Sequence, residues 1–229
     1  MLEVKKVDGI LFVHRHFVET RNAFSLSEAG ELLQKLHEEK PSGLLLTAGG
    51  SVFCSGGQLK EYAARPEDGV TVNLEITGIL QKIVELPIPK CVLVDGGCFG
   101  GGVELISAFD RVLATPRAQF ALWQRRIGLS FGWGGEARLV QRMGCGALKD
   151  WYVTTKLINV YAAQRLGLVD EVVSLSRGVV AAEEWLRSSS QYSKMALSAF
   201  SDPQLSESET FSKLWLNEDH KKALAPYSS

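Results

Sequence analysis

The alternation of short apolar runs with amphipathic segments restricts the fold of this sequence more than any other feature. The runs "GLLLTA" at 43–48 and "KCVLVDGG" at 90–97 lack the apolar–polar alternation of a half-exposed strand. Such runs are typical of strands that are buried on both faces. Each run follows a segment with apolar residues at helical spacing, at 25–40 and at 70–87. The alternation therefore predicts an α/β core.

Further segments extend this pattern along the chain. Ser25 or Ser27 is suited to cap the helix at 25–40, which ends before a proline. The C-terminal part of the sequence shows only helical patterns. These features predict a core over residues 1–175 and a helical C-terminal region over 176–229. The other expected elements are strands at 9–15, 111–115 and 118–122 and helices at 103–109 and 136–144.

Charge and hydropathy exclude two classes of partner. The formal net charge is −1, and no block of basic residues is present. A nucleic-acid partner is therefore not expected. The longest apolar runs fall far short of the roughly 20 residues that a membrane-spanning helix needs. The first residues, "MLEVKKVDG", lack the apolar stretch of a secretion signal, so neither secretion nor a membrane partner is expected.

The cysteines indicate the cellular compartment. Cys54, Cys91, Cys98 and Cys145 show no CxxC spacing and lie in apolar or glycine-rich surroundings. This pattern is typical of reduced thiols in a cytoplasmic protein. It predicts a cytoplasmic location, and it implies neither disulfides nor a metal site.

The stretch "CFGGGVELISAFD" at 98–110 places three glycines before a single acid, Glu104, in an otherwise apolar helix. A helix that begins near Gly101 presents free backbone N–H groups, which favour a negative charge nearby. The spacing matches neither the GxGxxG dinucleotide loop nor the P-loop. Taken alone, the motif favours a tight strand-to-helix turn that binds no ligand.

A second glycine pair, in "VFCSGGQLKE" at 52–61, follows the buried strand at 43–48. Ligands of α/β proteins gather outside the carboxyl ends of strands, where both glycine turns are expected to lie. Two converging N–H donors would form an oxyanion hole, which stabilises a negatively charged oxygen. The alternative is two ordinary turns that do not meet.

Six motifs occur in an informative order and spacing. They are "RNAFSL" (21–26), "FCSGGQLKE" (53–61), "GGCFGGGVELISAFD" (96–110), "AQF" (118–120), "GWGGEARL" (132–139) and "AAQRLGLVDEVV" (162–173). Together they resemble the crotonase, or enoyl-CoA hydratase/isomerase, superfamily over about residues 10 to 175. The tail at 209–227 resembles the last helix of that family.

The resemblance implies a crotonase-like spiral of ββα units, assembled through the helical C-terminal region as a homotrimer or a dimer of trimers. It also implies that the substrate is a thioester of CoA or of an acyl-carrier protein. Coenzyme A then enters as part of the substrate, and no separate cofactor is expected. In such a site the N–H groups of Gly57 and Gly101 hold the thioester oxygen.

The same resemblance suggests which residues contact the substrate. The family usually has aspartate where this chain has Gln58, so one side-chain contact with CoA differs here. The expected substrate-lining residues are Arg21, Asn22, Ala23, Ser55, Gln58, Leu59, Lys60 and Gly100.

The catalytic acids depart from the family pattern. Hydratases of this family use two glutamates, of which the first aligns with Glu104 and the second with Gln124, in "AQFALWQRRIG". Glutamine can orient water or a carboxylate, but it has no proton to exchange near neutral pH. Two-acid hydration is therefore weakened, and so is isomerisation, for which many family members use the second acid.

Decarboxylation requires fewer catalytic groups than hydration or isomerisation. Loss of CO2 from a malonyl- or glutaconyl-type thioester forms an enolate, which an oxyanion hole stabilises without a general base. The elements "FCSGG" and "GWGG" resemble the decarboxylase branches of the superfamily, so a decarboxylase is the leading hypothesis. The alternatives are a hydratase or isomerase that uses Glu104 alone and a low-activity scaffold that binds CoA esters.

The role of Glu104 in a decarboxylase is open at this point. It either protonates the enolate carbon or only positions the substrate. A carboxyl that merely forms hydrogen bonds in the core is the third possibility, although buried acids are costly and therefore favour a function.

Residues around Gln124 offer groups for the departing carboxylate. Gln124, Arg125 or Arg126 is a candidate to orient it, and the alternative for the two arginines is an exposed surface pair. Trp123 or Trp133 is a candidate for the apolar wall that destabilises it.

One motif suggests a different enzyme class. "GLSFG" at 128–132 matches the GxSxG of a hydrolase nucleophile, with Ser130 as nucleophile and His220 as a possible base. The preceding "LWQRRI" is a poor strand, so the hydrolase hypothesis is disfavoured. The remaining histidines, which show no metal-ligand spacing, are His14, His16 and His37.

Overall fold

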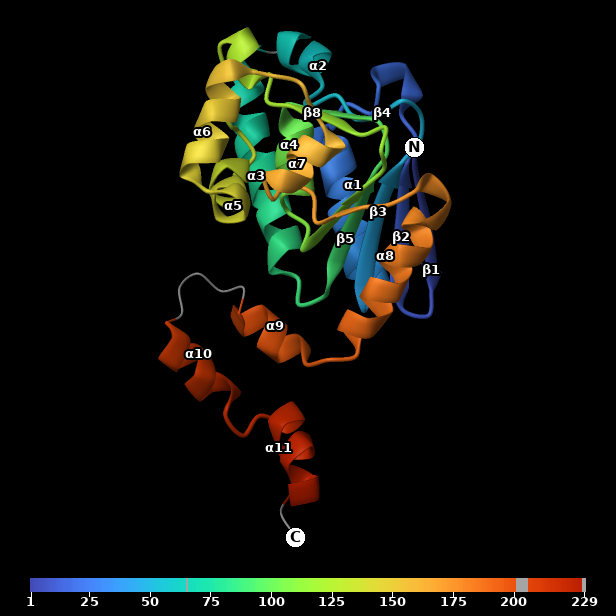
Figure 1. The fold of residues 1–229 in the computed structure, drawn as a ribbon, viewed down its shortest axis with the longest axis vertical. Coiled ribbons are helices and arrows are strands. Elements are labelled where there is room, and N and C mark those ends of the chain that lie inside the picture. The colour runs from blue at the N-terminus through green and yellow to red at the C-terminus, as the bar shows by residue number, and fades with distance from the viewer. Residues whose placement is uncertain (65, 201–205, 228–229) are drawn as a thin grey trace.

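The computed structural model describes residues 1–64, 66–200 and 206–227, and its strands form two sheets (Figure 1). The larger sheet has the strand order β1-β2-β3-β5-β7-β10, and the smaller has the order β4-β6-β8-β9. The strands are β1 (Leu2–Val7), β2 (Ile10–Arg15), β3 (Gly43–Ala48), β4 (Val52–Cys54), β5 (Lys90–Val94), β6 (Gly97–Phe99), β7 (Arg111–Ala114), β8 (Gln119–Ala121), β9 (Ile158–Asn159) and β10 (Glu171–Val172).

Helices connect and cover these strands. The α-helices are α1 (Leu26–Glu39), α2 (Leu59–Ala64), α3 (Gly69–Glu85), α4 (Gly101–Ile106), α5 (Gly135–Met143), α6 (Cys145–Thr154), α7 (Val160–Arg165), α8 (Leu175–Ser190), α9 (Lys194–Phe200), α10 (Glu207–Leu214) and α11 (Glu218–Leu224). Short 3-10 helices are η1 (Val18–Thr20), η2 (Pro66–Asp68), η3 (Gln124–Ile127) and η4 (Ala225–Tyr227).

Successive strands alternate between the two sheets. β3, β5 and β7 belong to the larger sheet, and β4, β6 and β8, which follow them in the chain, belong to the smaller one. Neighbours within each of these two sets are parallel. Helices α2 and α3 follow β4, and α4 follows β6. This arrangement confirms the predicted α/β spiral of ββα units.

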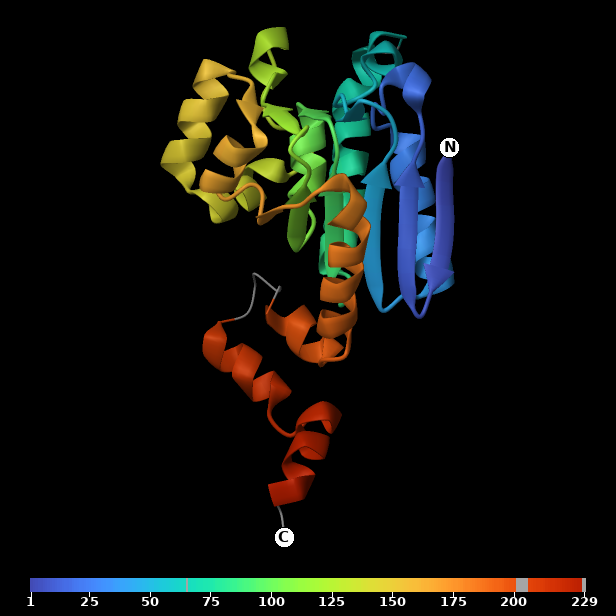
Figure 2. The same cartoon turned by 45° about the vertical axis from the view of Figure 1, so that its right-hand side comes forward.

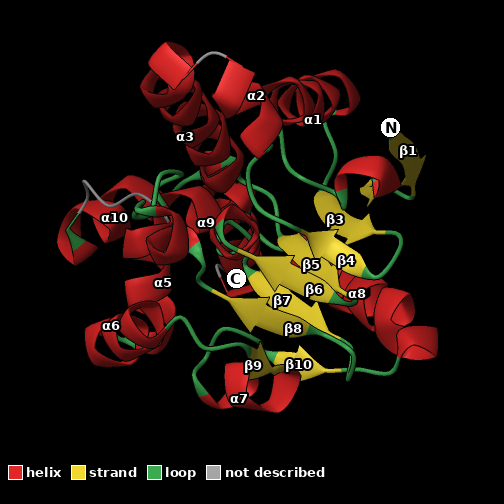
Figure 3. Cartoon of the chain, turned by 90° about the horizontal axis from the view of Figure 1, so that it is seen from above, coloured by secondary structure: helices red, strands yellow, loops and turns green. Residues whose placement is uncertain are grey.

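The strands β3 and β5 of the larger sheet are buried on both faces, as the apolar runs predict. Leu44 and Leu46 of β3 belong to the same core cluster as the apolar sides of α1 and α3. Leu45, which points the other way, packs in a second cluster with Ala182 of α8. Figure 3 shows α1 and α3 on one side of the strands and α8 on the other.

The run at 90–97 forms two strands in different sheets, so the prediction of a single strand was wrong in its extent. Gly96, between β5 and β6, has a φ of 90°, and a Cβ on it would lie 2.2 Å from the carbonyl oxygen of Ser51. Only glycine fits this turn. The turn directs the residues that precede Glu104 into the smaller sheet.

Two parts of the fold lie outside the sequence-based expectations. β1 pairs antiparallel with β2, although its charged residues conceal the strand pattern. Helices α6 and α7 follow α5 and carry the chain back to the smaller sheet through β9.

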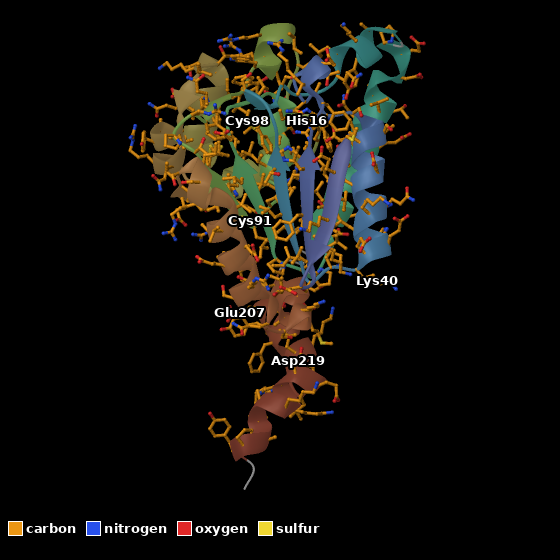
Figure 4. The ribbon with its side chains drawn as sticks, turned by 90° about the vertical axis from the view of Figure 1, so that its right-hand side faces the viewer. His16, Lys40, Cys91, Cys98, Glu207 and Asp219 are labelled. Atoms are coloured by element: carbon orange, nitrogen blue, oxygen red, sulfur yellow. The ribbon has the colours of Figure 1, made fainter. Side chains whose placement is uncertain are left out.

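The helices after α8 extend away from the sheets (Figures 1 and 2). Figure 4 labels Glu207 and Asp219 on this arm, and every element described between residues 176 and 227 is helical, as predicted. Its exposed apolar side chains include Phe200, Phe211 and Tyr227. Oligomerisation through this region stays a prediction. Within the described ranges, no helix is long and apolar enough to cross a membrane.

The cysteines are unpaired. All four lie in the described part of the chain, and none forms a disulfide. Cys91 and Cys98 are buried in the strands (Figure 4). Burial raises the pKa of Cys91 to about 12, so its thiol stays protonated and unreactive at neutral pH.

Candidate active site

The two glycine turns predicted to converge lie in contact. They follow β4 and β6, which are neighbouring parallel strands with Cys54 opposite Cys98. A Cβ placed on Gly56 would lie 3.5 Å from the backbone nitrogen of Gly101. The backbones at the carboxyl ends of these two strands are therefore in contact.

The backbone N–H groups of Gly57 and Gly101 are available where these turns meet. Gly101 is the first residue of α4, so its N–H has no acceptor within the helix. The N–H of Phe24 donates to the Gly56 carbonyl over 2.8 Å and fixes the turn before Gly57. Among the described residues, neither glycine N–H serves as a donor in a hydrogen bond. Two such donors on adjoining turns suit a developing oxyanion.

Glu104 lies one helical turn beyond Gly101 and is only 2% exposed. Its Oε2 accepts hydrogen bonds from the backbone N–H groups of Trp133 over 2.9 Å and of Gly135 over 3.1 Å. The N–H of Gly132 lies 3.2 Å from Oε2 and 3.3 Å from Oε1. Burial raises the pKa of the Glu104 carboxyl, and the hydrogen bonds from Trp133, Gln124, Gly132 and Gly135 offset part of that rise.

Gln124 faces Glu104 from η3, at the position that aligns with the second acid of the family. Its Nε2 donates to Glu104 Oε1 over 3.2 Å, and the side chain is 8% exposed. Its Oε1 is buried and has no hydrogen-bond partner among the described residues. The structure therefore brings the predicted pair together, but as a carboxylate and an amide.

Trp133 covers both glycines with its indole ring. A Cβ on Gly101 would lie 2.5 Å from Cζ3 of this ring, and a Cβ on Gly57 would lie 3.3 Å from its Cζ2. The ring also packs against Phe24, with 5.6 Å between the ring centroids. Of the two tryptophans suggested as an apolar wall, Trp133 thus lies beside both glycines, whereas Trp123 stacks on Phe99.

Helix α3 holds the Trp133 ring, a contact that the sequence analysis missed. Asn73 Oδ1 accepts from Trp133 Nε1 over 3.0 Å and from the Tyr62 hydroxyl over 3.2 Å. Thr77 Oγ1 donates to the Gly132 carbonyl over 2.8 Å. The helix was predicted from its apolar positions alone. Asn73 and Thr77 are four residues apart and therefore lie on one face of it, and this polar pair is the sequence feature that could have indicated the contact.

The two segments predicted to line the CoA channel lie side by side. Ser55 Oγ donates to the carbonyl of Thr20, next to Arg21. Arg21 is exposed, whereas Asn22 is buried and its amide donates to the carbonyls of Gly49 and Val52. The remaining predicted residues are Ala23 (buried), Gln58 and Gly100 (half-buried), and Leu59 and Lys60 (exposed).

The arginines beside Gln124 point to the protein surface. Arg125 is exposed and bonds the carbonyl of Val153, and Arg126 donates to the carbonyl of Thr155 over 2.9 Å. Arg126 also lies over the Trp123 ring, 4.9 Å from its centroid. The structure thus joins Arg126 and Trp123 to each other and to the Thr155 loop.

The hydrolase alternative has no geometric support. Ser130 is exposed, and η3 separates it from the nearest strand, β8, so no nucleophile elbow forms. His220 belongs to α11, at the opposite end of the molecule from β8 (Figure 1), and its Nδ1 accepts from the N–H of Leu216. Across the described residues, no cluster of three His, Cys, Asp or Glu side chains is placed to hold a metal ion.

Comparison with known proteins gives a consistent result. The model of the family described as "Enoyl-CoA hydratase/isomerase" matches residues 6–220. An ethylmalonyl-CoA decarboxylase from Rattus norvegicus is 34% identical over 192 residues, and one from Mus musculus is 33% identical over 193. Each match covers 80% of this chain but only 64% and 60% of the respective relative, so the chain spans less than two thirds of their length.

Solved structures share the fold. An enoyl-CoA hydratase from Bacillus anthracis superimposes with a TM-score of 0.86 and 23% sequence identity, covering 99% of this chain and 95% of that chain. The human enoyl Coenzyme A hydratase domain-containing protein 3 gives a TM-score of 0.86 and 19% identity, covering 99% and 96%.

Proposed function

The chain belongs to the enoyl-CoA hydratase/isomerase family, and from this premise we propose that it is an acyl-CoA lyase that decarboxylates a malonyl- or glutaconyl-type thioester. The observation that carries the proposal is the pairing of Glu104 with the amide of Gln124 beside two free glycine N–H groups. The printed names of the rat and mouse relatives support the same reaction class. The acyl group is carried by CoA or by a carrier protein.

The reaction needs only groups that stabilise an enolate. The thioester oxygen accepts hydrogen bonds from the N–H groups of Gly57 and Gly101. These bonds stabilise the negative charge that develops on this oxygen as the enolate forms. In a malonyl-type thioester the bond between the α-carbon and the carboxylate then breaks, its electron pair forms the enolate, and CO2 leaves. A proton adds to the α-carbon to give the shortened thioester. In a glutaconyl-type thioester the carboxylate leaves from the γ-carbon, and the electron pair passes through the conjugated double bond to the thioester oxygen as a dienolate, which is protonated at the α- or γ-carbon. Oxyanion donors of this kind act without any proton transfer in the first step.

Hydration is the second candidate, because Glu104 is present. Addition of water to an enoyl thioester requires one group to take a proton from water and a source of the proton that reaches the α-carbon. Gln124 supplies neither, since its amide does not titrate near neutral pH. The site therefore favours loss of CO2 over gain of water.

A substrate panel tests the proposal directly. The protein is incubated with ethylmalonyl-, methylmalonyl-, methylglutaconyl- and crotonyl-CoA, and the products are followed by mass spectrometry. Loss of CO2 from at least one carboxylated thioester is expected, with little hydration of crotonyl-CoA. Intact carboxylated thioesters would refute the proposal. Hydration of crotonyl-CoA would then favour a hydratase, and binding without turnover would favour a scaffold.

Restoring the second acid is expected to change the reaction. In Gln124→Glu two carboxyl groups share one site, so the pKa of one of them rises and it becomes able to exchange a proton. We expect crotonyl-CoA hydration to rise by about tenfold or more, and decarboxylation to fall because the added charge repels the substrate carboxylate. Gln124→Met, of similar length, is the control and should gain no hydration. Equal rates of hydration in the two variants would contradict the assignment.

A further inference from the structure

The carboxylate of Glu104 contacts only hydrogen-bond donors among the described residues. They are the backbone N–H groups of Gly132, Trp133 and Gly135 and the Nε2 of Gln124, at 2.9 to 3.3 Å. No described acceptor lies on its oxygens to receive a carboxyl proton. Donors on every side favour the charged form of the group.

The segment that supplies these donors also carries the Trp133 ring. A Cβ on Gly135 would lie 2.5 Å from Cβ and Cγ of Glu104, so the segment lies directly on the Glu104 side chain. Arg138 of α5 donates to the carbonyls of Glu104 over 3.3 Å and of Trp133 over 3.0 Å. The backbone that carries the Trp133 ring is therefore held by contacts that converge on Glu104, while Asn73 of α3 holds the ring itself.

We propose that Glu104 is a positioning residue whose carboxylate anchors the segment 132–135, so that Trp133 forms a fixed wall beside Gly57 and Gly101 and limits the size of the substituent on the substrate α-carbon. This inference rests on the proposed function, and it assigns the proton that reaches the enolate to another source, such as water. Trp133 is then the residue that determines specificity, and Glu104 acts through it.

The burial of both side chains supports this assignment. Glu104 is 2% exposed and Trp133 is 3% exposed, and the backbone N–H of Trp133 donates to the Glu104 carboxylate, so the two residues are buried together. An acid that protonates an enolate must reach the α-carbon directly or through one water, with an oxygen free to carry the proton. In this arrangement the indole ring occupies the space beside the Cα atoms of Gly57 and Gly101, whereas the Glu104 oxygens are taken up by hydrogen-bond donors.

Amide hydrogen exchange tests the anchor without reference to turnover. In Glu104→Gln, one side-chain oxygen is replaced by an NH2 group that cannot accept from a backbone N–H. The amides of Gly132, Trp133 and Gly135 are expected to exchange at least about tenfold faster than in the unmodified protein. Glu104→Asp, which keeps the charge but is shorter, should give an intermediate rate. Unchanged exchange in both variants would overturn the inference.

Substrate preference separates a positioning role from proton donation. If Glu104 anchors the wall, Glu104→Gln and Trp133→Phe should both raise the ratio of kcat/KM for ethylmalonyl-CoA to that for methylmalonyl-CoA by severalfold, since one methylene is worth about tenfold or more in a tight apolar pocket. If Glu104 donates the proton, Glu104→Gln should lower both values equally, and that result would overturn the inference. Should the unmodified protein release CO2 from neither thioester, the proposed function fails, while the exchange experiment still decides the anchor.

The dependence of kcat/KM on pH is expected to have opposite directions for Glu104 as an anchor and for Glu104 as a proton donor. The anchor needs the carboxylate, so kcat/KM should fall as pH decreases through the raised pKa of Glu104, and this fall should be absent in Glu104→Gln. A proton donor must be protonated, so activity would fall as pH increases instead. Of the neighbouring groups, burial lowers the pKa of Arg138, although a guanidinium stays charged in proteins, and burial raises the pKa of Cys54 in β4, which favours its neutral thiol.

Discussion

Replacement of Gly57 by proline is expected to lower decarboxylation by about 10²- to 10³-fold, the effect typical of losing one oxyanion-hole donor. Proline has no backbone N–H, so only Gly101 would remain to hold the thioester oxygen. The loss should fall on kcat more than on KM, because the hydrogen bond strengthens as negative charge develops on that oxygen. Steady-state kinetics with the substrate identified in the panel provides the measurement.

Gly57→Ala is the matched control. Its Cβ would lie 3.0 Å from Cε2 of Tyr62 and 3.3 Å from Cζ2 of Trp133, so it introduces the Cβ that proline also has but keeps the N–H. Circular dichroism should show both variants folded. If the proline and alanine variants have the same kcat, the lost activity comes from crowding, and the oxyanion assignment of Gly57 is wrong.

The second large effect concerns stability, and it is expected at Arg15. Its side chain is fully buried and forms an ion pair with Glu28, which is 3% exposed. Arg15 also donates to the carbonyls of Phe53 and Asn22, each over 2.8 Å. Replacement by methionine leaves the Glu28 carboxylate buried without its partner. We expect the free energy of unfolding to fall by about 3–5 kcal/mol.

A double variant separates the ion pair from the packing. In Arg15→Met with Glu28→Leu no unpaired charge remains, and the double variant should regain about 2 kcal/mol of the loss. Urea denaturation of the single and double variants gives these values. A loss below about 1 kcal/mol in Arg15→Met would mean that water reaches Glu28 and that the pair does not hold the core.

The Arg15 cluster also explains how the fold supports the site. Arg15 at the end of β2 joins the loop at Asn22 to β4, and Phe24 in that loop donates to the carbonyl of Gly56. The Gly57 turn is therefore fixed from two directions. The family resemblance places Asn22 in the substrate channel. The structure shows its amide bonded to the carbonyls of Gly49 and Val52.

The fold was largely predictable because its signals are local. Apolar runs without alternation marked β3 and β5, and helical spacing marked α1 and α3 to within a few residues. The turn at Gly96 was not predicted, because its cause is the close approach of Ser51, which is distant in the sequence. β1 was missed for a related reason, since an edge strand with charged side chains lacks an apolar pattern.

For the site, the family resemblance carried by the six motifs pointed to the two glycine turns, Glu104 and the substitution at Gln124. These depend on residue type and spacing, which the sequence contains in full. The sequence alone leaves open whether Glu104 donates a proton or positions a neighbouring residue, because its role depends on which groups surround the two carboxylate oxygens. Only the tertiary structure brings the N–H groups of 132–135 onto the carboxylate and sets Trp133 over Gly57 and Gly101. Segments some 30 residues from Glu104 supply these contacts, and no local pattern encodes the packing that joins them.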